Sequence, residues 1–134
     1  MNKQLFRLTA TAAALALGSA SMCVLAADNE IVVGQSVALT GPLAEVGNDF
    51  SAAMKAYFDY INAKGGANGK RIRLIVKDDA SVPAQTFQNA QALINQNVDL
   101  LAGFTGTPNV ALLARTKTLQ KNNIALVGPL TGAD

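Results

Sequence analysis

The sequence contains no histidine, no tryptophan and only one cysteine, Cys23. Without histidine the commonest acid–base side chain is missing, and a single cysteine forms neither an internal disulfide nor a cysteine cluster for zinc. No serine lies in the Gly-x-Ser-x-Gly motif of hydrolases. These absences argue against an enzyme, and we expect no metal and no cofactor.

Charged residues are also scarce, at 15% of the chain. Two of the eleven basic residues, Lys3 and Arg7, lie near the N-terminus, which leaves nine basic residues against nine acidic ones. A near-neutral protein lacks the basic surface with which nucleic-acid-binding proteins neutralise phosphates. We therefore expect no nucleic-acid partner.

Residues 1–27 have the layout of a secretory signal peptide. The basic Lys3 and Arg7 precede the apolar run 9–17, TATAAALAL, and the small-residue stretch 18–27 offers a cleavage site after Ala26 or Ala27. The apolar run is shorter than the roughly 20 residues that cross a bilayer. The alternative, a lipoprotein cut before Cys23, is disfavoured by the bulky Met22. We expect export to the periplasm and a mature chain without cysteine or disulfide.

From residue 28 onward, short apolar runs alternate with amphipathic ones. The predicted strands are 30–39, 71–76, 98–103 and 124–129, and the predicted helices between them are 48–63, 84–97 and 109–122. This order predicts an α/β fold with a doubly wound parallel sheet in three α/β/α layers. In such sheets, ligands bind outside the carboxyl ends of the strands.

The glycine-rich stretch 65–71, GGANGKR, admits two interpretations. A phosphate-binding P-loop needs four residues between its glycines, a Ser or Thr after the lysine, and a strand before it. Here only three residues separate Gly65 from Gly69, Arg71 follows Lys70, and a helix comes first. A left-handed helix cap followed by an Asn-Gly turn fits better.

Three Thr/Gly loops follow predicted strands and supply the candidate binding residues. The segment 104–111, FTGTPNVA, offers Gly106 and Thr107, the segment 127–134 offers Thr131, and the segment 38–49 offers Thr40. Hydroxyls and helix N-terminal amides suit a carboxylate, although Thr-Pro is also an ordinary helix cap. With no base or nucleophile nearby, the loops favour binding a polar small molecule.

The adjacent pair Asp78-Asp79 ends the second predicted strand. Paired carboxylates hold a divalent cation or act as acid and base in some proteins. No third acidic residue has a matching spacing, so solvated caps and turn hydrogen bonds are favoured.

The segment 36–80 resembles the N-terminal lobe of bacterial periplasmic binding proteins of the Leu/Ile/Val-binding type. The shared features are the glycine loop after the first strand, the helix exit "INAKGGANGK" and the "DDA" after the second strand, and the resemblance extends over 30–134. It implies the substrate-binding subunit of an ABC importer, with an amino acid or related small carboxylate as ligand and a membrane permease as partner. An exported ligand-sensing receptor domain of the same fold is the alternative.

The resemblance also implies site residues. They are the hydroxyl of Thr107, with Gly106 beside it, and the loop Leu130, Thr131 and Gly132. An aromatic residue often packs on the ligand from the position that Val46 occupies here, so the stacking contact is missing. Because such receptors have two lobes, we expect 28–134 to be a truncated N-terminal lobe, unable to close around a ligand alone.

Overall fold

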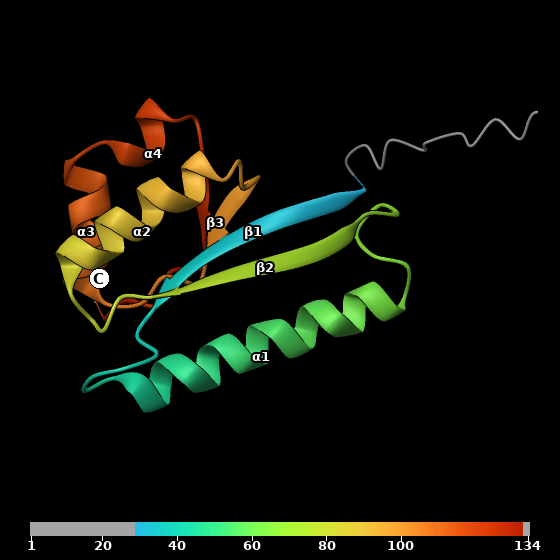
Figure 1. Ribbon diagram of the computed structural model, residues 1–134, viewed down its shortest axis with the longest axis horizontal. Coiled ribbons are helices and arrows are strands. Elements are labelled where there is room, and N and C mark those ends of the chain that lie inside the picture. The colour runs from blue at the N-terminus through green and yellow to red at the C-terminus, as the bar shows by residue number, and fades with distance from the viewer. Residues whose placement is uncertain (1–28, 133–134) are drawn as a thin grey trace, which may run out of the picture.

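The computed structural model describes residues 29–132 (Figure 1). The predicted signal peptide lies outside these residues. Along the chain, the elements are β1 (Glu30–Val37), α1 (Ala44–Ala63), β2 (Arg71–Asp78), α2 (Pro83–Asn95), β3 (Leu100–Ala102), α3 (Thr107–Arg115), α4 (Thr118–Lys121) and β4 (Leu126–Val127).

The strands form one parallel sheet in the order β2-β1-β3-β4. The longest pairing joins β1 to β2 and runs from Glu30↔Arg71 to Val37↔Asp78. Helix α1 covers one face of the sheet, while α2 and α3 lie on the other (Figure 1). The predicted doubly wound α/β/α fold is confirmed. Because every strand runs the same way, the loops after them gather at one edge.

The main core lies between the sheet and helices α2 and α3. Alternate residues of β1 face this core. At Gly34 the core has no room for a side chain, since a Cβ at this position would lie 3.0 Å from a methyl of Leu101. Burying a side chain the size of leucine contributes about 2 kcal/mol. The buried cluster comprises Ala90, Leu93, Val98, Leu101, Phe104 and Leu113.

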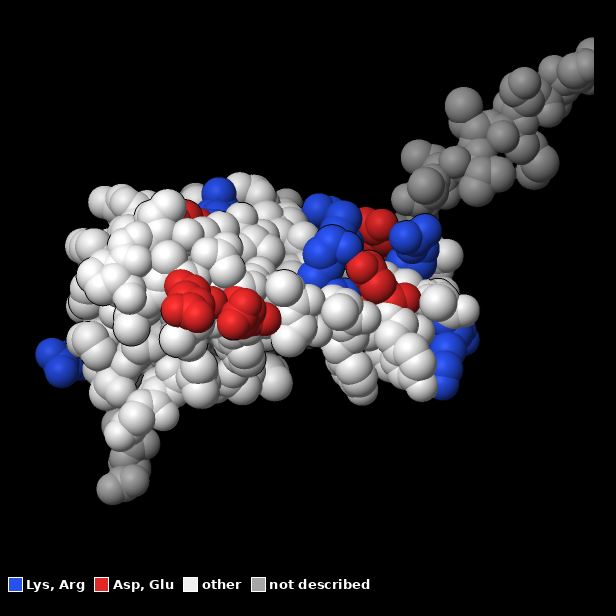
Figure 2. Space-filling model, turned by 90° about the horizontal axis from the view of Figure 1, so that it is seen from below, with Lys and Arg blue, Asp and Glu red and all other residues white. Residues whose placement is uncertain are grey.

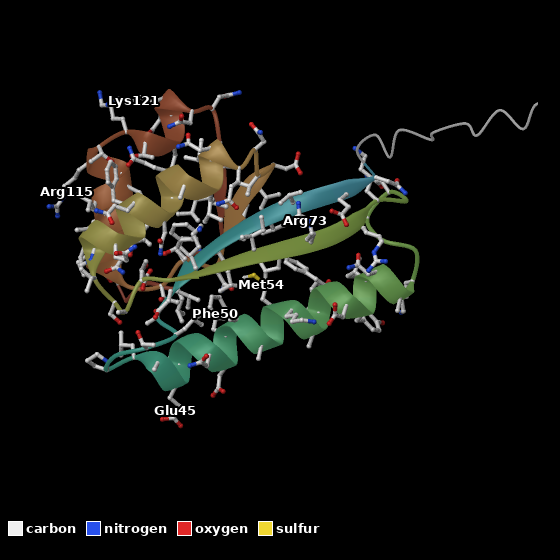
Figure 3. All side chains as sticks on the ribbon, in the orientation of Figure 1. Glu45, Phe50, Met54, Arg73, Arg115 and Lys121 are labelled. Carbon is white, nitrogen blue, oxygen red and sulfur yellow. The ribbon has the colours of Figure 1, made fainter. Side chains whose placement is uncertain are left out.

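The opposite face of the sheet packs on α1. Phe50 and Met54 point from α1 toward the strands (Figure 3), and both approach Gly103 just after β3. A Cβ on Gly103 would lie 2.2 Å from the Met54 Cε, and its φ is +61°. Only glycine satisfies both conditions, so this position fixes how closely α1 approaches the site edge.

The glycine-rich stretch is a structural turn, as predicted. The Gly66 N–H donates to Ile61 O (3.0 Å), which closes the end of α1. Asn68 and Gly69 both have positive φ and form a tight turn in which Ala67 and Lys70 exchange two backbone hydrogen bonds. The turn lies at the amino ends of the strands.

Several predicted boundaries were wrong. The predicted helix 109–122 begins at residue 107 and is interrupted after Arg115, because the Thr116 hydroxyl bonds back to Leu112 O (2.9 Å) and Lys117 adopts φ +54°. The predicted strand 124–129 keeps only Leu126–Val127 in the ladder, since Gly128 turns away at φ +55°. The first helix starts four residues earlier than predicted, at Ala44 instead of residue 48.

Within residues 29–132, no helix is long and apolar enough to cross a membrane. The same residues contain no group of three or more acidic, cysteine or histidine side chains placed to hold a metal ion.

Candidate functional site

The order in which the chain adds strands to the sheet reverses between β1 and β3, although all the strands are parallel. From β1 the chain crosses to β2 on one side, and from β3 it crosses to β4 on the other. In open α/β sheets, such a switch point leaves a crevice at the carboxyl ends of the two strands. A pocket of about 490 Å³ lies there, with walls from the loops after β1, β3 and β4. Its lining comprises Leu43, Val46, Gly47, Thr105, Gly106, Thr107, Pro108, Leu130, Thr131 and Gly132.

The first wall comes from the start of α1. Gly47 is buried against the backbone that leaves β1, and a Cβ on it would lie 1.8 Å from Ala38 O. Glycine therefore lets α1 sit directly on the strand end. Leu43 and Val46 are 48% and 51% exposed. Apolar side chains of this size, half-exposed beside a pocket, suit contact with an apolar part of a ligand.

The second wall comes from the segment between β3 and α3. The Gly106 N–H donates to Leu130 O (3.0 Å), and the Leu130 N–H donates to Phe104 O (2.8 Å), so this segment and the loop after β4 hold each other in place. Gly106 is the N-cap of α3 with φ +92°, and no side chain caps the helix. The first amides of α3 have no partner within the helix, so they carry partial positive charge at this wall.

The hydroxyl of Thr107 takes part in the loop contact instead of capping the helix. Its Oγ1 accepts a hydrogen bond from the Gly132 N–H (3.1 Å). A hydroxyl has one proton to donate, and accepting a bond leaves that proton available. Thr107 is thus placed as a hydrogen-bond donor toward the pocket, which suits an anionic oxygen.

The structure brings together all the predicted site residues except Thr40. Gly106, Thr107, Val46 and the loop Leu130–Gly132 line the pocket. Thr40 does not line it, because its hydroxyl donates to Asp78 Oδ2 (2.6 Å) and its N–H to Asp78 Oδ1 (3.2 Å). The position of Thr40 after a predicted strand correctly indicated a loop at this edge of the sheet. It could not show that the Thr40 hydroxyl donates to an aspartate 38 residues away.

Four lining residues were not among the predicted site residues. Thr105 and Pro108 lie within the predicted segment 104–111, whereas Leu43 and Gly47 come from the start of α1. Leu43 precedes a predicted helix, and in sequence an apolar residue at such a place looks like a core residue. Gly47 lies inside what proved to be the first turn of α1, where a glycine lowers helix propensity. An unfavourable glycine at that place was the available signal for a close approach.

The pair Asp78-Asp79 differs from the prediction in one respect. Both residues accept turn hydrogen bonds as predicted, but Asp79 is fully buried instead of solvated. The Thr40 hydroxyl, together with three backbone N–H groups, lowers the pKa of Asp78 to about 2. Among residues 29–132, the pocket lining contains no charged side chain.

A larger hollow, about 650 Å³, lies between α1 and the edge strand β2. It follows the length of the sheet edge and includes the exposed Lys55–Asp59 ion pair. It has neither the converging loops nor the helix N-terminus of the switch-point pocket, which we take as the candidate site.

Open α/β sheets commonly bind small molecules in a crevice of this kind, at a switch point lined by hydroxyls, amides and apolar side chains. The chain belongs to the periplasmic binding protein family, whose family model matches residues 30–134. It corresponds to the N-terminal part of a type I periplasmic binding protein, as the resemblance implied.

Three relatives illustrate the similarity. The Leu/Ile/Val-binding protein homolog 2 of Brucella abortus is 33% identical over 77% of this chain and 26% of its own length. The substrate-binding periplasmic protein of Ralstonia solanacearum has a TM-score of 0.74 and 39% identity, over 77% of this chain and 30% of its own. An ABC-transporter solute binding protein from Rhodopseudomonas palustris, solved in complex with 3,4-dihydroxy benzoic acid, has a TM-score of 0.65 and 33% identity, over 76% of this chain and 28% of its own. The chain spans less than a third of each.

Proposed function

We propose that this chain is the N-terminal lobe of an exported substrate-binding protein of an ABC importer, which binds an amino acid or a related small carboxylate and delivers it to a membrane permease. The observation that carries the proposal is the placement of the Thr107 hydroxyl and the α3 N-terminus beside Leu43 and Val46. One side of the pocket suits a carboxylate, and the other suits an apolar body.

The relatives support this ligand class without selecting one member. The name of the Brucella protein refers to branched-chain amino acids, and the Rhodopseudomonas protein holds an aromatic carboxylate. A carboxylate and an apolar body are common to both. Since the described lining has no carboxylate that would pair with an ammonium group, any amino group of the ligand would need a partner elsewhere in the receptor.

The proposal includes the domain plan. Residues 1–27 act as the signal peptide that leads to the periplasm, and 28–134 form part of a lobe whose receptor closes with a second lobe. Support comes from the small share of each relative that the chain covers. Sequencing the gene beyond codon 134 tests this plan, and a stop codon without any in-frame continuation would contradict it.

Thr107 gives the direct test of the site. In the full-length receptor, Thr107→Val removes the donor but keeps the shape, and we expect ligand binding to weaken by about 1–3 kcal/mol because a charged partner loses a hydrogen bond. Thr107→Ser keeps the hydroxyl and serves as the control. Calorimetry with leucine, isoleucine, valine and 3,4-dihydroxybenzoate measures the difference. Equal affinities for all three proteins would remove Thr107 from the site.

An exported sensor with the same fold is the second candidate function. Its binding lobe has the same chemistry, so the pocket does not separate the two. Gene neighbours do: permease and ATPase genes favour the importer, and a kinase or chemoreceptor gene favours the sensor.

A further inference from the structure

Asp78 is the last residue of β2 and Asp79 follows it, beside the pocket loops, yet neither lines the pocket. Successive residues of a strand point to opposite faces of the sheet. Asp78 pairs with Val37 and lies on the α1 side, whereas Asp79 is buried on the α2 side. The two adjacent carboxylates therefore reach different parts of the site.

Asp78 holds the loop that leads from β1 to the first wall. Its Oδ1 accepts the Leu39 N–H (2.9 Å) and the Thr40 N–H (3.2 Å), and its Oδ2 accepts the Thr40 hydroxyl (2.6 Å). Three donors from two consecutive residues fix the direction in which the chain leaves the strand. The next turn begins α1 and carries Leu43 and Val46.

Asp79 holds the second wall through a chain of side chains. Its Oδ2 accepts the Thr86 hydroxyl (2.9 Å) and the Ser36 hydroxyl (2.8 Å). The Thr86 Oγ1 in turn accepts the Asn109 side-chain N–H (2.7 Å). All four side chains are buried, so water does not compete for these bonds.

Asn109 connects this chain to the pocket. It lies in the first turn of α3, two residues after Thr107, and its Oδ1 packs against Gly106, where an added Cβ would lie 3.2 Å away. The Thr86 hydroxyl has one proton, and the Asp79 carboxylate (2.9 Å) is a nearer acceptor for it than Val82 O (3.2 Å). The Thr86 oxygen is then the acceptor for the Asn109 side-chain N–H. The carboxylate at the end of β2 thus fixes the position of the α3 N-terminus.

We propose that Asp78 and Asp79 are positioning residues that each hold one wall of the pocket in its binding geometry, without touching the ligand. Asp78 sets the Leu43–Val46 wall through the loop after β1, and Asp79 sets the Thr107 wall through Thr86 and Asn109. The inference rests on the proposed function, in which this pocket takes the ligand.

Hydrogen exchange of the full-length protein without ligand tests whether Asp78 and Asp79 each hold a different wall of the pocket. Asp78→Ala is expected to speed amide exchange about tenfold or more in residues 38–47 and to leave 104–110 unchanged, because the loop after β1 loses three hydrogen bonds to Asp78, which lowers its local opening free energy. Thr86→Val is expected to speed amide exchange in residues 104–110 and to leave 38–47 unchanged. Thr86→Ser keeps the hydroxyl and serves as the control.

If Thr86→Val does not fold, Asn109→Ala replaces it, since this variant removes only the last link and leaves Thr86 bonded to Asp79. Equal acceleration of both segments by either variant, or acceleration of neither, overturns the proposal. A purely structural role would lower stability throughout and would not produce the crossed pattern.

Affinity for the tightest binder among leucine, isoleucine, valine and 3,4-dihydroxybenzoate then connects positioning to binding. We expect Thr86→Val to weaken binding about tenfold, and much less so when Thr107→Val is already present, because both act at the same wall. Additive losses overturn the link through α3. A crossed exchange pattern with no binding by any probe would contradict the proposed ligand class and leave the assignment of the two walls standing.

Discussion

At the amino end of the sheet, polar side chains bind one another or a neighbouring backbone, whereas at the carboxyl end hydroxyls and amides border a pocket. The Asn62 side chain forms two hydrogen bonds with the backbone of Ile72, and Arg73 pairs with Glu30. At the other end, Thr107 and the first turn of α3 retain donor groups beside apolar Leu43 and Val46.

The charged residues follow the same division. Figure 2 shows Lys, Arg, Asp and Glu gathered at the amino end of the sheet, on the right, while the other half of this face carries an acidic patch and a few isolated charges. Charges at the amino end are solvated and contribute little, since exposed ion pairs are worth about 0–1 kcal/mol. The glycines and the lysine of 65–71 thus form a turn at the charged amino end, whereas the candidate site lies at the carboxyl end, where the described pocket lining has no charged side chain.

The largest effect is expected from filling the close approach at Gly47. Gly47→Val would place side-chain atoms where Ala38 O lies, so α1 must shift away from β1, at about 3 kcal/mol of unfolding free energy or more. The exposed Ala53→Val on the same helix is the control for the helix propensity of valine. Chemical denaturation measures both, and equal stabilities would contradict the contact.

A smaller effect is expected at the amino end, from Asn62→Ala. This change leaves the Ile72 N–H and C=O at the sheet edge without their partner, and we expect a loss of about 1–3 kcal/mol. Ligand affinity should not change, because the residue lies far from the pocket loops. The exposed Lys64→Ala is the control, and weakened binding by Asn62→Ala would break the comparison between the two ends.

Asp78, at the carboxyl end of the sheet, should make the stability of the protein depend on pH in the acid range. Because the folded-state pKa of Asp78 is about 2, below the ordinary 3.8, its stabilising contribution is complete above pH 4 and is lost as the pH falls from about 4 to about 2. Asp78→Asn lacks this contribution. The denaturation midpoints of the two proteins should therefore converge as the pH falls toward about 2. A difference between the midpoints that stays the same at every pH would contradict the lowered pKa of Asp78.

The smallest effect is expected from Lys55→Ala. The Lys55–Asp59 pair on α1 is exposed on both sides, at 68% and 63%, so its loss should change stability by no more than about 0.5 kcal/mol. A thermal unfolding curve checks this. A loss above about 1 kcal/mol would mean that the charged surface matters more than the comparison between the ends allows.

Much of the fold was predictable because its signals are local. The alternation of apolar runs gave the order of strands and helices, and the Asn68-Gly69 turn followed from residues that adopt positive φ. The boundaries were less predictable. The break after Arg115 depends on the Thr116 hydroxyl bonding back to the helix, which a threonine in sequence does not announce.

The order of apolar runs and the shared motifs were enough to predict the fold class, the sheet edge at which a ligand would bind, and the family. Which hydroxyls reach the pocket depends on contacts between residues far apart in the chain. Thr40 and Thr107 are equivalent in sequence, each in a Thr/Gly loop after a strand, yet the hydroxyl of Thr40 binds Asp78 and that of Thr107 lies in the pocket lining. Each hydroxyl forms its hydrogen bond with a group that only folding brings near. For Thr40 this group is Asp78, 38 residues away, and for Thr107 it is the Gly132 N–H, 25 residues away.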